Sequence, residues 1–211
     1  MRNLEHNSLD AIKAQLREWI QLDYIIPEDI PSIELYMDQV TTFMDQQLAN
    51  NKRNEEDKTL TKTMINNYTK NNMLPPPEKK KYSKDHIILL IYIYYLKNFI
   101  SIRDIQTLLT PMIETYFSKE ENGIDLNDIY SDIFHLEKDY YNHMKSSVFD
   151  SYEMVSKAFE GKSDYLKELG FIMLLSYDIY AKKQLIEKMI DGMKPVNPEP
   201  AKSKENTKNN K

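Results

Sequence analysis

The residues best suited to chemistry in this sequence lie on one face of a short helix expected over residues 61–71. At 100° per residue, one arc of this helix collects two ammonium groups, a hydroxyl and a carboxamide, and no acid. These residues are Lys62, Thr63, Asn66 and Lys70. Lys binds phosphate oxygens or guanine, and Asn can pair with the edge of adenine. The arc therefore predicts contact with double-stranded DNA, although an ordinary solvated helix face would have the same composition.

A basic loop follows this helix and strengthens the prediction. Lys79, Lys80 and Lys81 come after three prolines, and Lys84 lies at the start of the next helix. The net charge of the chain is −5, yet residues 52–86 hold nine Lys and Arg against five Asp and Glu. A basic stretch inside an acidic protein is the asymmetry that a local phosphate-binding surface would show. Lysine runs of this kind are also common on surfaces that bind nothing.

A second cluster could hold a divalent metal. His135, Asp139 and His143 are one helical turn apart, with Asp128 and Asp132 nearby. Imidazole and carboxylate at this spacing can share an ion. The opposite stripe of the same helix is apolar and is expected to face the core. It consists of Leu126, Ile129, Ile133, Leu136 and Tyr140. The His and Asp stripe is then simply the water-facing side, and we expect no metal site.

Several functional classes are excluded by what the sequence lacks. It has no Cys and only 4 Gly, so thiolate chemistry and Gly-rich phosphate loops are absent. No HExxH motif, nucleophile–base pair or convincing carboxylate pair occurs, so we expect neither enzyme activity nor a cofactor. The longest apolar run, 87–96, is too short to span a bilayer, and the N-terminus lacks the apolar segment of a secretion signal. A cytoplasmic protein without membrane contact is expected.

The elements that must position these residues are predicted from apolar residues three or four positions apart. Nearly all of the chain is expected to be helical, with no sheet beyond a minimal strand pair near 79–82. The helices expected in the first half are 8–26, 31–48 with Ile33 in its apolar face, 60–72, 83–96 and 101–110, with a further turn or two restarted by Pro111. Helix 31–48 would brace helix 61–71 as in a helix-turn-helix, across a connector of about ten residues.

Two longer amphipathic helices are expected after a break at Asn122-Gly123. The first runs from about Asp125 to Phe159, with an interruption allowed near Ser146-Ser147, and the second from Ser163 to about Ile190. The expected core residues of the second are Leu166, Leu169, Met173, Tyr177, Tyr180 and Leu185. Residues 194–211 are almost free of apolar side chains and are expected to be disordered.

The middle of the chain resembles the winged helix-turn-helix of mercury-resistance (MerR-type) regulators. The similar stretches are MINNYTKNNMLPP, KKYS and KNFISIRDI, between Leu60 and Leu109. Over its whole length the chain resembles the bacterial family called domain of unknown function 1836. The resemblance implies an all-α fold, with a winged helix-turn-helix (MerR-like) domain followed by a helical C-terminal region, and the role of a DNA-binding transcriptional regulator.

The resemblance also implies roles for single residues. Tyr68 matches the backbone-contacting tyrosine of the MerR type, and Lys70 keeps its basic residue. The phosphate-binding Arg and its neighbouring Tyr are Asn66 and Asn67 here, and the Gly of the LGFS turn is Phe99. Asn72 replaces a Gly after the helix, a conservative change because Asn tolerates a left-handed backbone. Only five residues separate Pro76 from Tyr82, so the wing is short.

These inferences combine into a domain plan with two functional hypotheses. We expect a DNA-binding domain with its N-terminal helix over 1–110, a helical dimerisation or effector region over 111–193, and a disordered tail over 194–211. A homodimer would bring two recognition helices to half-sites one DNA turn apart, and tyrosines could line a pocket for a small-molecule effector. The alternative is a helical protein-interaction adaptor that has the fold but not the DNA contact.

Overall fold

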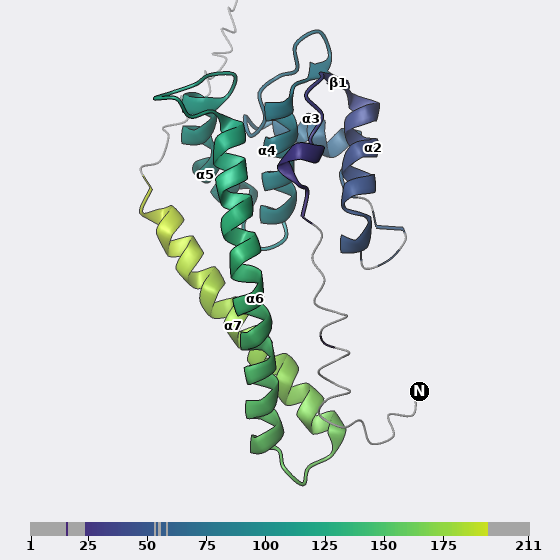
Figure 1. The fold of residues 1–211 in the computed structure, drawn as a ribbon, viewed down its shortest axis with the longest axis vertical. Coiled ribbons are helices and arrows are strands. Elements are labelled where there is room, and N and C mark those ends of the chain that lie inside the picture. Colours follow the sequence, from purple (N-terminus) through teal and green to yellow (C-terminus); the bar gives the residue numbers. More distant parts are fainter. Residues whose placement is uncertain (1–15, 17–23, 53, 55, 58, 194–211) are drawn as a thin grey trace, which may run out of the picture.

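The computed structural model describes residues 16, 24–52, 54, 56–57 and 59–193, and most of its regular structure is helical. Figure 1 shows a head of short helices and an arm in which two long helices extend away from it. The predicted all-α class is confirmed at this level. Of the helix expected over 8–26, only Leu16 and residues 24–26 are described, and residues 24–26 are not helical, so the predicted end of this helix is wrong. The tail 194–211 lies outside the described residues.

Helix α2 covers Met37–Gln47, so the predicted start near Pro31 is wrong. Residues Leu35–Tyr36 instead form strand β1, which pairs antiparallel with strand β2, Lys81–Tyr82. The N–H of Tyr36 then donates to Gln39 Oε1 at 2.9 Å and begins the helix. Ile33, expected on the apolar face, is 70% exposed. The minimal strand pair near 79–82 therefore forms with a partner that is remote in sequence and that local periodicity could not reveal.

The other head helices begin within two residues of their predicted starts. Helix α3 is Lys62–Lys70, α4 is Lys84–Leu96 and α5 is Ile102–Tyr116. Helix α4 is the centre of the head, with an unbroken buried run from His86 to Ile91. The Ser101 hydroxyl accepts from the N–H of Asp104 at 3.1 Å and caps α5. Capping of this kind satisfies N–H groups that have no partner inside the helix.

Pro111 does not restart the chain, contrary to the prediction, because α5 continues through it to Tyr116. A proline inside a helix removes one backbone hydrogen bond and costs about 3 kcal/mol. Apolar side chains on both sides of the proline, including Ile105, Leu109 and Ile113, pack in or against the head core. Their burial offsets the local cost, since each buried aliphatic side chain contributes about 1.5–3 kcal/mol.

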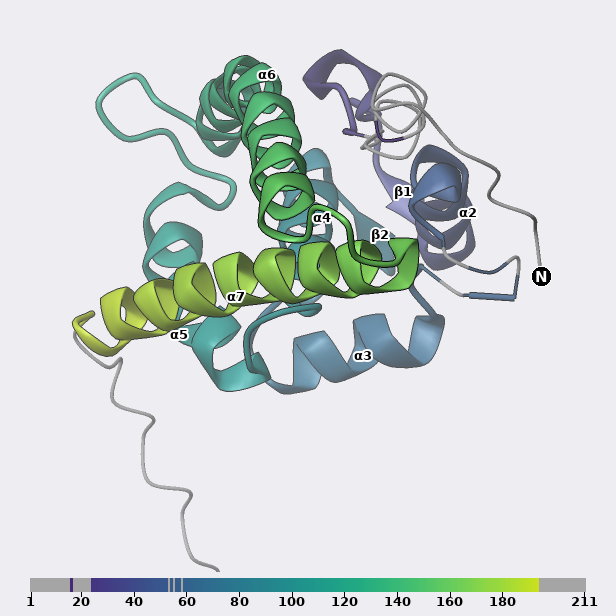
Figure 2. The ribbon, with the colours of Figure 1, turned by 90° about the horizontal axis from the view of Figure 1, so that it is seen from below.

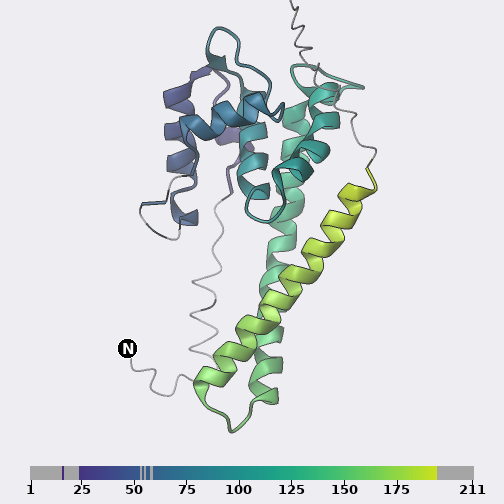
Figure 3. The same ribbon diagram turned by 180° about the vertical axis from the view of Figure 1, so that it is seen from behind.

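The arm consists of α6, Leu126–Ala158, and α7, Asp164–Asp191. Both long helices were predicted, and α6 runs without interruption past Ser146. Figures 1 and 3 show the two helices crossing along the arm, with the far end of α7 returning to the head beside α5. Among the described residues, every helix is too short or too polar to traverse a lipid bilayer.

Two separate cores hold these elements together. The head core joins α2–α5 and also takes in Leu126 and Tyr130 of α6 and Ile190 of α7. The tip of the arm has its own cluster. It contains Leu16, Tyr152, Val155 and Phe171, with Val148, Phe149, Phe159, Leu174 and Leu175 packed against them. The domain boundary expected at residue 110 falls inside α5, and the head core reaches beyond it.

Several side chains expected in the core are instead exposed on the arm. On α6 these are Leu136 and Tyr140, at 69% and 53% exposure. On α7 they are Leu166, Leu169, Met173, Tyr177, Tyr180 and Leu185. The predicted core positions assumed that each helix buries a single apolar face. Only the opposite face of α7 packs on α6, so the second apolar face remains in solvent.

Candidate nucleic-acid interface

Helix α3, the predicted recognition helix, is capped at both ends by residues that directly flank it. The hydroxyl of Thr61 accepts from the N–H of Met64 at 3.2 Å. At the other end the N–H of Asn72 donates to the carbonyl of Thr69 and that of Met73 to the carbonyl of Tyr68. This is the Schellman arrangement, which requires a left-handed residue after the helix. Asn72 takes that conformation, with φ of 54°, as its replacement of Gly predicted.

The connector before α3 is anchored to the head by polar contacts. It runs over residues 48–61, longer than the ten residues estimated from the sequence. Asp45 Oδ1 accepts from the Thr59 hydroxyl at 3.0 Å and pairs with Lys52 at 2.6 Å. Lys97 of the α4 C-cap donates to the carbonyl of Thr59 at 2.9 Å. These contacts connect the ends of α2 and α4 to the start of α3 and so fix its position.

Helix α3 lies on the outside of the head, and Figures 2 and 3 show no other described helix passing over it. Its inner face packs in the core through Ile65 and Tyr68. Burial raises the pKa of Tyr68, and only 6% of this residue is exposed, which leaves little of it to touch DNA. The exposed side chains of the predicted site on this helix are Lys62, Thr63, Asn66, Asn67 and Lys70.

One member of the predicted acid-free row has an acidic neighbour. Lys62 forms an ion pair with Asp38 in the first turn of α2. Both side chains are largely exposed, and an exposed pair of this kind is worth about 0–1 kcal/mol. The row is therefore free of acids within α3 but not across the junction with α2. Thr63, Asn66, Asn67 and Lys70 remain as the uncharged or basic part of this surface.

The basic loop forms a two-residue turn. The N–H of Lys81 donates to the carbonyl of Glu78 at 2.8 Å, and Lys79 and Lys80 occupy the two central positions. Both have left-handed backbones, with φ of 48° and 66°, and both side chains are exposed. Positive φ at both central residues is the type I′ geometry that joins antiparallel strands and favours Asn-Gly. Lysine at both positions is therefore unfavourable for the turn itself.

The remaining predicted lysines are less available. Lys81 lies in β2, with its ammonium 3.6 Å from Glu34 Oε2 and 5.9 Å from the centre of the Tyr36 ring. Lys84 begins α4 and is half-buried. Of the four lysines predicted in this segment, Lys79 and Lys80 are thus the exposed ones.

A buried histidine holds the base of this loop. The N–H of Ser83 donates to His86 Nδ1 at 3.0 Å, which leaves the proton of a neutral imidazole on Nε2. Burial lowers the pKa of His86 by more than the backbone carbonyls of Pro76 and Pro75 raise it. The ring also stacks edge-to-face on Tyr82 and Phe117. His86 therefore links β2 to the end of α5.

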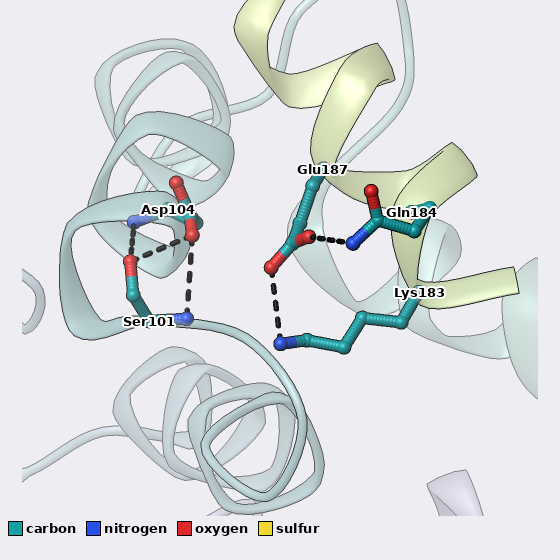
Figure 4. Close-up of polar contacts among 5 residues, drawn as sticks. All are labelled: Ser101, Asp104, Lys183, Gln184 and Glu187. Atoms are coloured by element: carbon teal, nitrogen blue, oxygen red, sulfur yellow. Dashed lines mark hydrogen bonds and ion pairs between the residues drawn. The ribbon is translucent and has the colours of Figure 1, made fainter. Parts of the chain in front are cut away.

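The polar clusters outside this region are local to their helices. His135 and His143 are exposed on α6, and across the described ranges no three His, Asp or Glu side chains gather closely enough to hold a metal ion. Figure 4 shows the polar residues where α7 meets α5. Ser101 bonds with Asp104 of its own helix, while Glu187 contacts Lys183 at 3.1 Å and Gln184 at 3.2 Å along α7.

Two residues at this surface were not anticipated. Asn71 is exposed beside Asn67, and its amide donates to the Asn67 carbonyl at 2.8 Å. Its place just after a basic helix end could have suggested a role. Asp38 reaches Lys62 only because α2 and α3 pack together, and no local pattern signals that pairing.

Comparison with known proteins gives a family match. The sequence model of a family described as "Domain of unknown function (DUF1836)" matches residues 25–133. The match extends from the segment before α2 into the first turns of α6, so it covers the head and leaves most of the arm outside. No curated protein and no solved structure matches the chain.

Proposed function

Since the chain belongs to the DUF1836 family, matched through its head, we propose a function that the head carries: sequence-specific DNA binding by a transcriptional regulator. In this proposal α3 is the recognition helix of a MerR-like winged helix-turn-helix, braced by α2. The turn at Lys79-Lys80 is a short wing. Base edges would be read by Asn66, Asn67 and Thr63, while Lys70, Lys79 and Lys80 bind phosphates.

The observation that carries the proposal is the outer face of α3. From Thr63 to Lys70 this face offers a hydroxyl, two carboxamides and an ammonium, all exposed, on a helix that itself has no acid. A short helix with its apolar side buried and such a row outside can enter the major groove. The Thr61 cap and the Asn72 terminus hold the row in a defined register, which base recognition requires.

The residue choice at the turn supports a role for its lysines. A second two-residue turn in the same chain, closed by hydrogen bonds between Glu121 and Ile124, has Asn122 and Gly123 at its centre with φ of 55° and 79°. Those residues suit a left-handed backbone, whereas lysine there costs about 1–2 kcal/mol. Retaining Lys79 and Lys80 in the same geometry is understandable if their charges are needed. Local strain of this type is commonly found at functional sites.

Direct binding to labelled duplexes tests the proposal. We expect saturable binding in fluorescence anisotropy at low salt, with log K falling with log salt at a slope of about −3, as three phosphate-binding lysines imply. Lys80→Gln should weaken binding to all duplexes alike, whereas Lys138→Gln, an exposed lysine on α6, should not. Absence of saturable binding to AT-rich and upstream-region DNA would refute the proposal.

Base reading needs its own comparison. Asn66→Ala should relax the sequence preference recovered by selection from random duplexes, since a good bidentate contact discriminates by about 1–3 kcal/mol. Asn142→Ala, at an exposed position on α6, is the matched control. An unchanged preference in the Asn66 variant would place α3 outside the groove.

The ion pair between Lys62 and Asp38 favours a second candidate, a helical adaptor that binds protein rather than DNA. The carboxylate would repel phosphate at the start of α3. The two hypotheses predict opposite results for Asp38→Asn. A DNA-binding head should gain affinity when the acid is removed, because Lys62 is then free to contact phosphate. An adaptor should show no DNA binding in either form and a stoichiometric protein partner on purification from its native cell.

A further inference from the structure

Helix α7 has two apolar faces, and only one of them is covered by the arm itself. The covered face packs on α6 through Phe171, Leu174 and Leu175. Gly170 permits this close approach, because a Cβ at that position would lie 2.9 Å from Cε2 of Phe159. The contact defines which side of α7 is directed at α6, and so identifies the opposite side as the free one.

The free face extends over residues 165–180. At 100° per residue its members fall within an arc of about 160°, opposite the side that packs on α6. They are Tyr165, Leu166, Leu169, Ile172, Met173, Ser176, Tyr177, Ile179 and Tyr180. No charged residue lies on this arc. The middle of the face is well exposed, with Ile172 at 59%, Met173 at 61% and Tyr177 at 69%. We call these nine residues the α7 face.

Such a face is unusual for a helix that stays in water. A helix with apolar residues all round is normally buried, and a large exposed apolar patch usually marks an interaction site. The composition is that of an interface core, which is enriched in aromatic residues and Met and depleted of charge. The α7 face has three tyrosines and one methionine among its nine residues.

We propose that the α7 face binds a second copy of this chain, with the two α7 helices packed antiparallel about a twofold axis near Ile172 and Met173. With about 150–250 Å² for a full tyrosine side chain and about 60–120 Å² for an aliphatic one, the exposed part of the face amounts to about 450–800 Å² per copy. A standard interface buries about 800 Å² per partner. The area therefore lies between the low end of specific interfaces and the standard size, which is enough for a reversible dimer.

The length of the face fits an antiparallel copy. The α7 face ends at Tyr180. From Lys183 to Ile190 the same side of the helix lies against α5 and the head core. Helix α7 begins at Asp164. With the axis near Ile172, Asp164 of one copy lies opposite Ala181 of the other. The start of α7 in each copy therefore lies where α7 of the other copy reaches the head. A parallel pair would direct both heads at the same end.

The residues also match under this symmetry. Along the pair, Tyr165 of one copy is level with Tyr180 of the other, and Leu166 is level with Ile179. Near the middle Leu169 faces Ser176, a large residue against a small one. At the centre Ile172 of one copy is level with Met173 of the other, and across the axis each of these two residues lies beside its own counterpart. A twofold interface uses the same patch on both copies, and this pattern satisfies that requirement.

Cysteine cross-linking tests the geometry in the folded wild-type background. The chain contains no native Cys, so a single introduced thiol reports on one position. Under mild oxidation Met173→Cys, next to the axis, should give a disulfide-linked dimer in high yield. Ser146→Cys, exposed on α6, should remain mostly monomeric on a denaturing gel. Equal yields from the two variants would overturn the proposed arrangement.

Sedimentation across a concentration series tests the association itself. The full chain should be a dimer at tens of micromolar, and Ile172→Glu should weaken the dimer about 100-fold or more, because two acids are then buried beside the axis. Ser146→Glu adds the same charge elsewhere on the arm and should leave association unchanged. A wild-type chain that is monomeric throughout the series would overturn the proposal, whatever else covers the face.

The dimer and the DNA-binding function can fail separately. Sedimentation and cross-linking are performed without nucleic acid, so they report on α7 alone. A dimer that does not bind DNA leaves the inference intact and removes the proposed function. A monomer that binds DNA with low affinity does the reverse.

Discussion

Replacing Lys79 and Lys80 by Asn and Gly should make the head more stable and at the same time a weaker DNA binder. The two lysines are the central residues of the turn between Glu78 and Lys81, and both have left-handed backbones. The double variant K79N/K80G supplies the pair that this geometry favours. It also removes the two most exposed ammonium groups of the proposed wing.

The expected size of each effect comes from the turn geometry. A left-handed backbone costs an ordinary residue about 1–2 kcal/mol, and Asn and Gly recover much of this at two positions. Glycine returns about 0.5–1 kcal/mol of that gain through the greater freedom of the unfolded chain. A net stabilisation of about 1–2 kcal/mol remains, or about 2–8 °C in Tm for a protein of this size. Removing two phosphate contacts should reduce the salt slope of DNA binding by about 1.8.

Thermal unfolding followed by circular dichroism measures the first effect, and fluorescence anisotropy over a salt series measures the second. Two further variants separate charge from backbone. K79Q/K80Q keeps the strained turn without the charges, so it should lose DNA affinity at unchanged Tm. K79R/K80R keeps both charge and strain, so it should match the wild type in both measurements.

Two results would refute the reasoning. If K79N/K80G has the Tm of the wild type or a lower one, the turn does not carry the strain that its φ angles imply. If its DNA binding has the same affinity and salt slope as the wild type, Lys79 and Lys80 do not touch phosphate. With the second result, the presence of lysine at this turn would no longer support DNA binding by the head.

Three further predictions concern the packing of the head and arm. Gly170→Ala should destabilise the tip of the arm by up to about 2 kcal/mol, because the clash of the new Cβ with the Phe159 ring, about 1–3 kcal/mol, exceeds the gain of about 1 kcal/mol that Ala has over Gly in a helix. A gain in unfolding free energy in urea would contradict this. Tyr130→Phe removes the 2.6 Å hydrogen bond to the buried carbonyl of Ile25 and should lower the free energy of unfolding in urea by about 1–3 kcal/mol. An unchanged urea midpoint would mean that water replaces the hydroxyl. The pKa of His86 in the folded protein lies below the ordinary value of about 6.5, so the unfolded chain binds a proton at His86 more readily. The free energy of unfolding should therefore fall as pH drops below about 6.5. His86→Gln should flatten this pH dependence, and an equally steep fall in the variant would assign the dependence to other groups.

The helices of the head were predictable where the cap and the apolar repeat agree. The helices expected from about 61, 83 and 101 begin there, because Thr61, Ser83 and Ser101 each act as a cap on N–H groups within three residues. The left-handed conformation of Asn72 follows from the same kind of local chemistry. The segment before α2 was not predictable, since its pairing with β2 joins residues more than forty positions apart.

The candidate site divides in the same way. The row on α3 was visible as a helical periodicity, and the structure exposes Thr63, Asn66 and Lys70 together. The ion pair of Lys62 with Asp38 and the conformation of the Lys79-Lys80 turn depend on neighbours from other elements. The apolar residues of α7 were also visible, but they were assigned to the core. A helical repeat of apolar residues does not tell whether another element of the chain packs on them.

The sequence by itself determined the helical class, the ends of most helices and the residue types available on α3, because these depend on interactions over a few residues along the chain. Only the tertiary structure decided which lysines stay free, how the wing turns and which face of α7 remains in water. Those outcomes depend on contacts between elements distant in sequence, and a side chain's exposure is a property of the packed whole.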